Sequence, residues 1–230
     1  MNLTNNVTKT ISFTVVLLLV FAISFCVNAP DHTSQGIDTV RAAAEQGDAA
    51  AQSRLGWMYE VGSGVAQNYA LAIKWYERAA QQGDAAAQTN LGLMYQLGEG
   101  VPRDYQKAVV WLRKAAEKGE MYAENALGVS YMSGLGVPQD YKEAAHWNIR
   151  AAEQGMPIAQ WNLGWMFAEG LGMPRDFVRA YVWSGLAADQ GIEKAKRNKE
   201  EIAKYLTPKQ KEDAEALLQR QRAVVPSVAH

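Results

Sequence analysis

The stretch DAAAQTNLGLMYQLGEGVPRDYQKAVVWLRKAAEKG, residues 84–119, sets a pattern that most of the chain repeats. Three further segments of the same length carry it, at residues 48–83, 120–155 and 156–191. Self-similarity at a fixed period of about 20–50 residues is typical of proteins that stack one small unit many times. The chain is therefore predicted to be organised by repetition.

Residues 84–119 read as two helices joined by a turn. In the first half, the apolar side chains fall on one helical face: Ala87, Leu91, Met94 and Tyr95. This helix is predicted over 86–97, and Gly98 suits a left-handed C-cap. Asp104 suits the N-cap of a second helix, predicted over 105–117. The unit is therefore a helix–turn–helix hairpin.

The four copies agree at a few positions. The second helix of each carries one tryptophan: Trp75, Trp111, Trp147 and Trp183. The first helix of each has a glycine at its middle: Gly56, Gly92, Gly128 and Gly164. Glycine inside a helix costs roughly 1 kcal/mol relative to alanine, so we expect the second helix to approach closely there. The tryptophans are predicted to lie in the core.

The shared pattern A-x-x-x-L-G-x-x-Y-x-x-G-x-G-V-P-x-D-Y-x-x-A-x-x-W-x-x-x-A-A-x-x-G resembles the Sel-one-like repeat, a relative of the tetratricopeptide repeat. The resemblance covers residues 48–191, with small departures at Ala66, Asn68 and Met173. It implies an all-α fold, a right-handed α/α superhelix or solenoid. It also implies a scaffold for protein–protein interaction. In bacteria such proteins are often exported and serve envelope, signalling or host-contact roles.

The segments that flank the repeats are predicted to cap the solenoid. Residues 30–47 read as a polar linker and a capping helix, with Thr39 where a repeat has its tryptophan. Residues 192–222 read as C-terminal capping helices, the last of them with Thr207 as its N-cap, and 223–230 as a tail. Terminal units of a solenoid are expected to be atypical in this way.

Residues 1–29 read as a targeting segment, because Lys9 precedes the apolar run ISFTVVLLLVFAISFCV. The segment is predicted to be a signal peptide or, alternatively, a retained membrane anchor. Residues 30–230 are then exported, to the periplasm or the cell exterior, or held at the inner membrane facing outward. The one cysteine, Cys26, lies in this segment, so no disulfide can form within the chain.

The residues contain no grouping that supports catalysis. The net charge is −1, which gives no electrostatic reason to expect nucleic acid. The three histidines, His32, His146 and His230, are far apart in the sequence. Aspartates recur just before the second helices, where they suit N-caps better than metal ligands: Asp104, Asp140 and Asp176. We therefore predict no catalytic residue, no metal and no cofactor.

Two alternatives to a plain scaffold remain open. Some secreted, cysteine-rich members of the resembling family are associated with penicillin binding or β-lactam hydrolysis, with a disulfide in every repeat that this chain lacks. The first alternative is a cell-envelope enzyme or inhibitor of this β-lactam or cell-wall type. The second is a membrane-anchored regulator, which requires that residues 1–29 are retained.

Positions where the copies differ are the candidates for partner choice. By analogy with tetratricopeptide repeats, one face of each first helix is expected to line a concave groove. The candidate contacts are Trp57, Glu60, Leu93, Gln96, Tyr122, Asn125, Met132, Trp161 and Trp165. Large exposed apolar side chains usually mark interfaces. Alternatively, these residues pack against the adjacent repeat. The predicted partner is an extended peptide or an amphipathic helix; the groove shows no basic cluster that would capture a C-terminal carboxylate.

Overall fold

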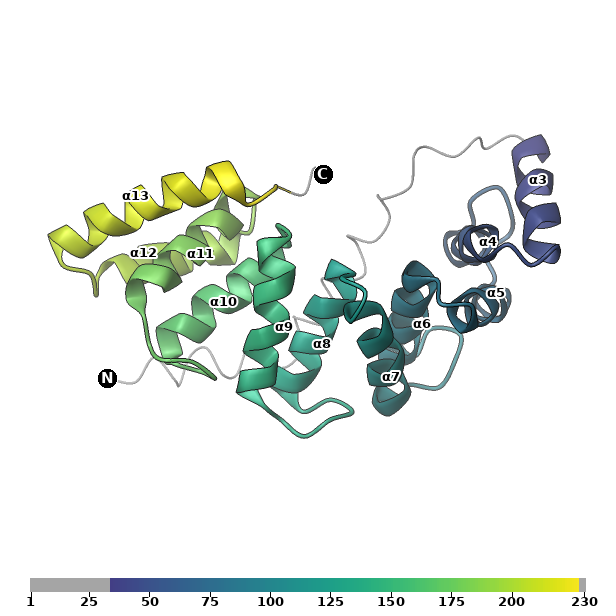
Figure 1. Cartoon of the computed structure of the whole chain (residues 1–230), viewed down its shortest axis with the longest axis horizontal. Coiled ribbons are helices and arrows are strands. Elements are labelled where there is room, and N and C mark those ends of the chain that lie inside the picture. Colours follow the sequence, from purple (N-terminus) through teal and green to yellow (C-terminus); the bar gives the residue numbers. More distant parts are fainter. Residues whose placement is uncertain (1–33, 228–230) are drawn as a thin grey trace.

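A computed structural model describes residues 34–227. This part of the chain contains eleven α-helices and no strand, and the helices follow one another along an arc (Figure 1). The predicted all-α solenoid of helix–turn–helix repeats is confirmed. The predicted signal segment with Cys26, and also His32 and His230, lie outside the described residues.

Four helical hairpins form the body, and each has a first helix, A, and a second helix, B. The hairpins are α4 (Ala49–Val61) with α5 (Tyr69–Gln81), α6 (Ala85–Leu97) with α7 (Tyr105–Ala116), α8 (Met121–Ser133) with α9 (Tyr141–Glu153), and α10 (Pro157–Glu169) with α11 (Phe177–Asp189). Before them lies α3 (Ser34–Glu45), and after them lie α12 (Glu193–Ala203) and α13 (Pro208–Val224). Each B helix packs against its own A helix and against the next one along the chain.

Side chains cap the hairpin helices as the sequence indicates. Gly98 ends α6 in the left-handed conformation, with φ 78°, and its N–H donates to the carbonyl oxygen of Met94. Asp104 begins α7 by accepting the backbone N–H of Lys107 at 3.0 Å. Asp140 and Asp176 cap α9 and α11 in the same way. The predicted N-cap role of these aspartates is confirmed.

The mid-helix glycines let each B helix lie directly on its A helix. A Cβ atom at Gly92 would lie 2.7 Å from Cγ of Leu112 and 3.2 Å from the backbone oxygen of Ala108, both on α7. The other three glycines face their own B helices at similar or shorter range. Close approach of the B helix, predicted as the reason for the glycines, is confirmed.

The A helices form the inner layer of the arc. Three of the four neighbouring pairs of A helices are in contact, α4 with α6, α6 with α8 and α10 with α12, whereas α5, α7 and α9 have no contact of comparable extent among themselves. In a curved two-layer stack, the layer whose helices lie closer together is on the concave side. The middle of α8 is accordingly buried all round, while α7 leaves Val110 54% exposed.

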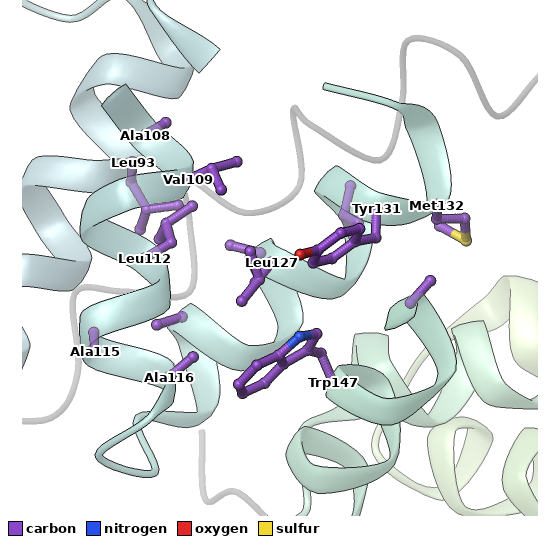
Figure 2. Close-up of a cluster of buried hydrophobic side chains, with 14 of the residues drawn as sticks. Leu93, Ala108, Val109, Leu112, Ala115, Ala116, Leu127, Tyr131, Met132 and Trp147 are labelled. Atoms are coloured by element: carbon purple, nitrogen blue, oxygen red, sulfur yellow. The ribbon is translucent and has the colours of Figure 1, made fainter. Parts of the chain in front are cut away.

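The repeated tryptophans are only partly a core feature. Trp147 is 6% exposed and belongs to the same buried cluster as Leu127 and Ala116 (Figure 2). Trp75, Trp111 and Trp183 are half-buried, so the prediction of a buried quartet is wrong for these three. All four rings occupy the same position of a B helix, so this position does not by itself bury the ring. Over Trp111 the ammonium of Lys114 lies 4.4 Å from the ring centroid.

This difference predicts unequal effects of removing the rings. Trp147→Ala should lower the free energy of unfolding by about 3–5 kcal/mol, because it leaves a cavity in a filled core. Trp111→Ala should lower it by about half as much, because part of that ring is already in water. Denaturant unfolding followed by circular dichroism measures both. Equal losses would contradict the burial difference.

The C-terminal cap departs from the hairpin plan. The helix α12 keeps the register of an A helix, with Ala195 and Ile202 buried, but it has Glu200 in place of the mid-helix glycine. A B helix therefore cannot lie on it closely, and α13 packs on α11 instead (Figure 1). There Gly185 makes room: a Cβ at this position would lie 2.7 Å from Cδ2 of Leu218.

Polar contacts fasten α13 in this position. The Tyr181 hydroxyl on α11 donates to the carboxylate of Glu215. Arg222 donates from Nε and Nη2 to the two carboxylate oxygens of Asp189, at 2.7 and 2.8 Å. The predicted N-cap Thr207 is confirmed, as part of a capping box with Gln210. These contacts thus join α13 to both halves of α11.

A polar ladder links each hairpin to the helix before it. In three A helices a glutamine amide donates to a carbonyl oxygen of the preceding helix at 3.0–3.3 Å: Gln52 to Ala44, Gln88 to Ala80 and Gln160 to Ala152. The helix α8 has Glu124 at this position, which is fully buried and has no N–H to donate. Arg150 of α9 instead donates to the carbonyl oxygen of Ala116 at 3.2 Å.

Arg150 also neutralises Glu124. Its Nε lies 2.8 Å from one carboxylate oxygen, and Nε2 of Gln154 donates to the carboxylate at 2.7 Å. Burial raises the pKa of Glu124, and the charge of Arg150 acts in the opposite direction. The third hairpin thus replaces a neutral glutamine contact with a buried ion pair.

Candidate functional site

The nine predicted partner contacts all lie on A helices, but four of them are buried. Leu93 is 4% exposed, Gln96 2%, Asn125 0% and Met132 5%. The prediction that these four side chains line an open groove is wrong. Whether the other five contact a partner stays a prediction: Trp57, Glu60, Tyr122, Trp161 and Trp165.

Contact between neighbouring A helices explains the burial. The helices α6 and α8 touch, and Leu93 and Met132 belong to one buried cluster that spans both (Figure 2). Trp161 and Trp165 of α10 pack against that cluster from the next hairpin. In the middle of the solenoid, the face opposite the B helix is therefore closed by neighbouring repeats.

At the N-terminal end, Trp57 and Glu60 make contacts that hold the hairpins together. Trp57 packs against the clusters on both of its sides, one shared with α3 and one shared with α6. Glu60 accepts the hydroxyl of Tyr76 at 2.5 Å, and Nδ2 of Asn90 donates to the same hydroxyl at 3.0 Å. Burial raises the pKa of Glu60. These contacts favour the packing alternative for both residues.

At the C-terminal end, α10 keeps an accessible face. Its half-buried residues recur at helical spacing on one side: Ile158, Trp161, Trp165 and Ala168. The remaining apolar residues of α10 are buried against the rest of the fold. Trp161 and Trp165 are each partly covered by the neighbouring cluster and partly accessible. We call this face of α10, together with the equivalent positions of α12, the inner face.

The helix α12 extends the inner face with cations. One period after Ile158 and Trp161 stand Lys194 and Arg197, both exposed. The register holds because Ala195 is buried as Ala159 is. The ammonium of Lys194 lies 5.6 Å from the ring centroid of Trp161. Neither residue is among the predicted contacts, which come from the four complete repeats; the same period carried past Gly191 reaches both.

Other kinds of site find no support in residues 34–227. In that part of the chain, no three histidine, cysteine, aspartate or glutamate side chains gather closely enough to hold a metal ion. Nor does any helix there combine the length and the apolar character needed to span a membrane. His146 is exposed and sets its ring edge-on to Trp147, with centroids 4.9 Å apart. The inner face is thus the strongest candidate.

The four helical hairpins match the model of a known protein family. The model of the Sel1 repeat matches residues 49–84, 85–120, 122–156 and 157–192, which together make up more than half of the chain. The chain belongs to the Sel1 repeat family. Sel1 repeat proteins generally act as scaffolds for protein–protein interaction and are typically not catalysts.

Solved structures of Sel1 repeat proteins are similar to this one. A Sel1 repeat protein from Oxalobacter formigenes is 38% identical, with a TM-score of 0.66 over 70% of this chain and 64% of that one. The protein c5321, a protective antigen present in uropathogenic Escherichia coli strains, is 33% identical, with a TM-score of 0.58 over 84% of this chain and 49% of that one. The chain thus spans under two thirds of the first and about half of the second. A search of curated proteins found no match.

Proposed function

We propose that this Sel1 repeat chain is an exported, non-catalytic scaffold that binds another protein through its inner face. The observation that supports binding there is the pair of half-buried tryptophans one turn apart, Trp161 and Trp165. Tryptophan is enriched among the residues that dominate binding energy, because a large rigid ring is buried at little cost in conformational entropy. Ile158, half-buried on the same side of α10, extends the apolar surface, and Tyr122 is half-buried at the equivalent position of α8.

The partner contributes an apolar segment, either an extended peptide or one face of an amphipathic helix. Elsewhere the half-buried tryptophans are less suited to this role. Trp75 and Trp111 lie on the outer layer, and neither has a second tryptophan one turn away on its helix. Export is supported by the charged residue and apolar run within residues 1–29.

Replacing both inner-face tryptophans should abolish capture of the partner. We choose Trp161→Leu with Trp165→Leu, because leucine retains apolar packing against the neighbouring buried cluster and removes the accessible part of the ring. The full chain, crosslinked in cells, is recovered from envelope extracts, and the captured proteins are identified by mass spectrometry. The wild type should retain a specific partner that the double variant loses.

The matched control is Trp75→Leu with Trp111→Leu, which makes the same change in two half-buried tryptophans of the outer layer. It should retain the partner, and circular dichroism should show native helicity for both double variants. Capture by the Trp161 and Trp165 variant equal to that of the wild type would reject the inner face. Recovery of the chain only from the cytoplasm would reject export.

A further inference from the structure

The inner face of α12 carries an excess of positive charge. At the positions equivalent to the accessible residues of α10, it has Lys194, Arg197, Glu201 and Lys204. Lys204 pairs with Glu201 at 2.6 Å. Within residues 34–227, Lys194 and Arg197 have no carboxylate within 4.0 Å. Glu193 and Glu200 correspond to Pro157 and Gly164, which do not face the accessible side of α10.

One of these two cations lies beside one of the two tryptophans. The helices α10 and α12 are in contact, and Lys194 lies over the ring of Trp161. Such a contact leaves the ammonium protons free to bind an anion, because the ring occupies only one side of the group. The face therefore offers an apolar half on α10 and a cationic half on α12.

We infer that the inner face binds a segment of a partner protein that is both acidic and apolar. The apolar side chain packs on Trp161 and Trp165, and the carboxylate pairs with Lys194 and Arg197. Charge complementarity selects this occupant: two free cations suit one or two carboxylates but not the long phosphate backbone of a nucleic acid. The inference rests on the proposed function and adds the chemistry of the partner to it.

The helix spacing sets the spacing within the partner. Axes of packed helices lie about 8–10 Å apart. An extended chain covers this distance in about three residues, at roughly 3.3 Å per residue. A helical segment needs about seven residues to cover the same distance, at roughly 1.5 Å per residue. The partner segment should therefore place an aspartate or glutamate about three residues from an aromatic or aliphatic anchor if extended, and about seven if helical.

Selection from a random peptide library tests this inference. A phage-displayed library of peptides of roughly 12 residues is panned against the full chain, and enriched peptides are synthesised for fluorescence anisotropy. The expected peptides have an acidic residue at one of the two spacings. Their affinity should fall about tenfold or more for Lys194→Glu with Arg197→Glu, and should weaken as salt is raised. Lys211→Glu with Arg220→Glu, two exposed cations of α13, is the matched control and should bind normally.

The outcomes separate this inference from the proposed function. Peptides that lose binding with Trp161→Leu and Trp165→Leu, yet bind the charge-reversed variant as well as the wild type, would overturn the acidic partner and leave the scaffold in place. Peptides that bind all variants equally, or no enrichment at all, would overturn both. A preference of the charge-reversed variant for peptides with lysine in place of the acidic residue would support the pairing directly.

Discussion

Arg150→Leu is expected to lower the free energy of unfolding by about 3 kcal/mol, because it leaves the carboxylate of Glu124 buried without its cation. Glu124 is fully buried, and Arg150 is the residue that pairs with it at 2.8 Å. The carbonyl oxygen of Ala116 loses its donor as well. The expected loss of stability is at the lower end of the range for breaking a buried ion pair, because the side chain of Arg150 is itself 37% exposed.

The double change Glu124→Gln with Arg150→Leu should recover most of this loss. It gives the third hairpin the pair already present in the fourth, where Gln160 stands with Leu186. There the glutamine donates to a carbonyl oxygen of the preceding helix and accepts from Gln190 at 2.9 Å. Urea unfolding of the three chains measures the rescue. A double variant no more stable than Arg150→Leu alone would show that the ion pair does not replace the glutamine contact.

Acidification provides a second check on the single variant. Burial raises the pKa of Glu124 and Arg150 lowers it, so removing Arg150 should raise it further. A carboxyl group with a raised pKa destabilises the fold when ionised, and this penalty disappears as the pH falls through the folded-state pKa. The stability deficit of Arg150→Leu should therefore shrink as the pH is lowered from neutrality through the raised folded-state pKa of Glu124. The double variant has no carboxylate there and should show no such gain.

Gly136→Ala is expected to lower the free energy of unfolding by about 3 kcal/mol, because it pushes two hairpins apart. Gly136 lies in the loop between α8 and α9, with φ 75°. A Cβ atom there would overlap the backbone carbonyl of Tyr105, at the start of the preceding B helix. Gly172 meets Tyr141 in the same way one repeat later. The second glycine of the loop is thus a contact point between successive hairpins.

Gly119→Ala is the matched control for this substitution. Gly119 has a similar φ of 88°, but nothing lies within 4 Å of the position that a Cβ would occupy. Gly119→Ala should lower the free energy of unfolding only by the cost of placing alanine in the left-handed conformation, about 1–2 kcal/mol. Denaturant unfolding of both variants isolates the contact between hairpins as the difference. Losses of the same size would mean that conformation alone accounts for the glycine.

Much of the fold was predictable because it depends on local interactions. Gly98 and Asp104 cap helices through backbone groups a few residues away, so the residue type at one position is enough to predict the structure. The mid-helix glycine at Gly92 was interpretable for a related reason. Its cost in helix propensity recurs in every copy, and the contact that explains it lies within the same hairpin.

The candidate site was predicted less well, because burial on the A helices depends on neighbours. Leu93 and Met132 lie on the side away from the B helix, where a single hairpin would leave them exposed. The stacking of α6, α8 and α10 covers them. Trp161 and Trp165 were correctly placed on a helix face, and the sequence left open whether they pack on the adjacent repeat; the structure shows that they do so in part.

The repeat itself determined the hairpin, its caps and the period of the solenoid, because each of these rests on contacts within about 36 residues that recur in every copy. The tertiary structure decided which part of the inner layer stays accessible and where the charge lies. The middle closes because neighbouring repeats cover it, whereas the inner face of α12 stays accessible because no further A helix follows it within residues 34–227 and α13 packs on α11. Lys194 and Trp161 lie on helices of successive repeats, so it is the packing between repeats that brings them together.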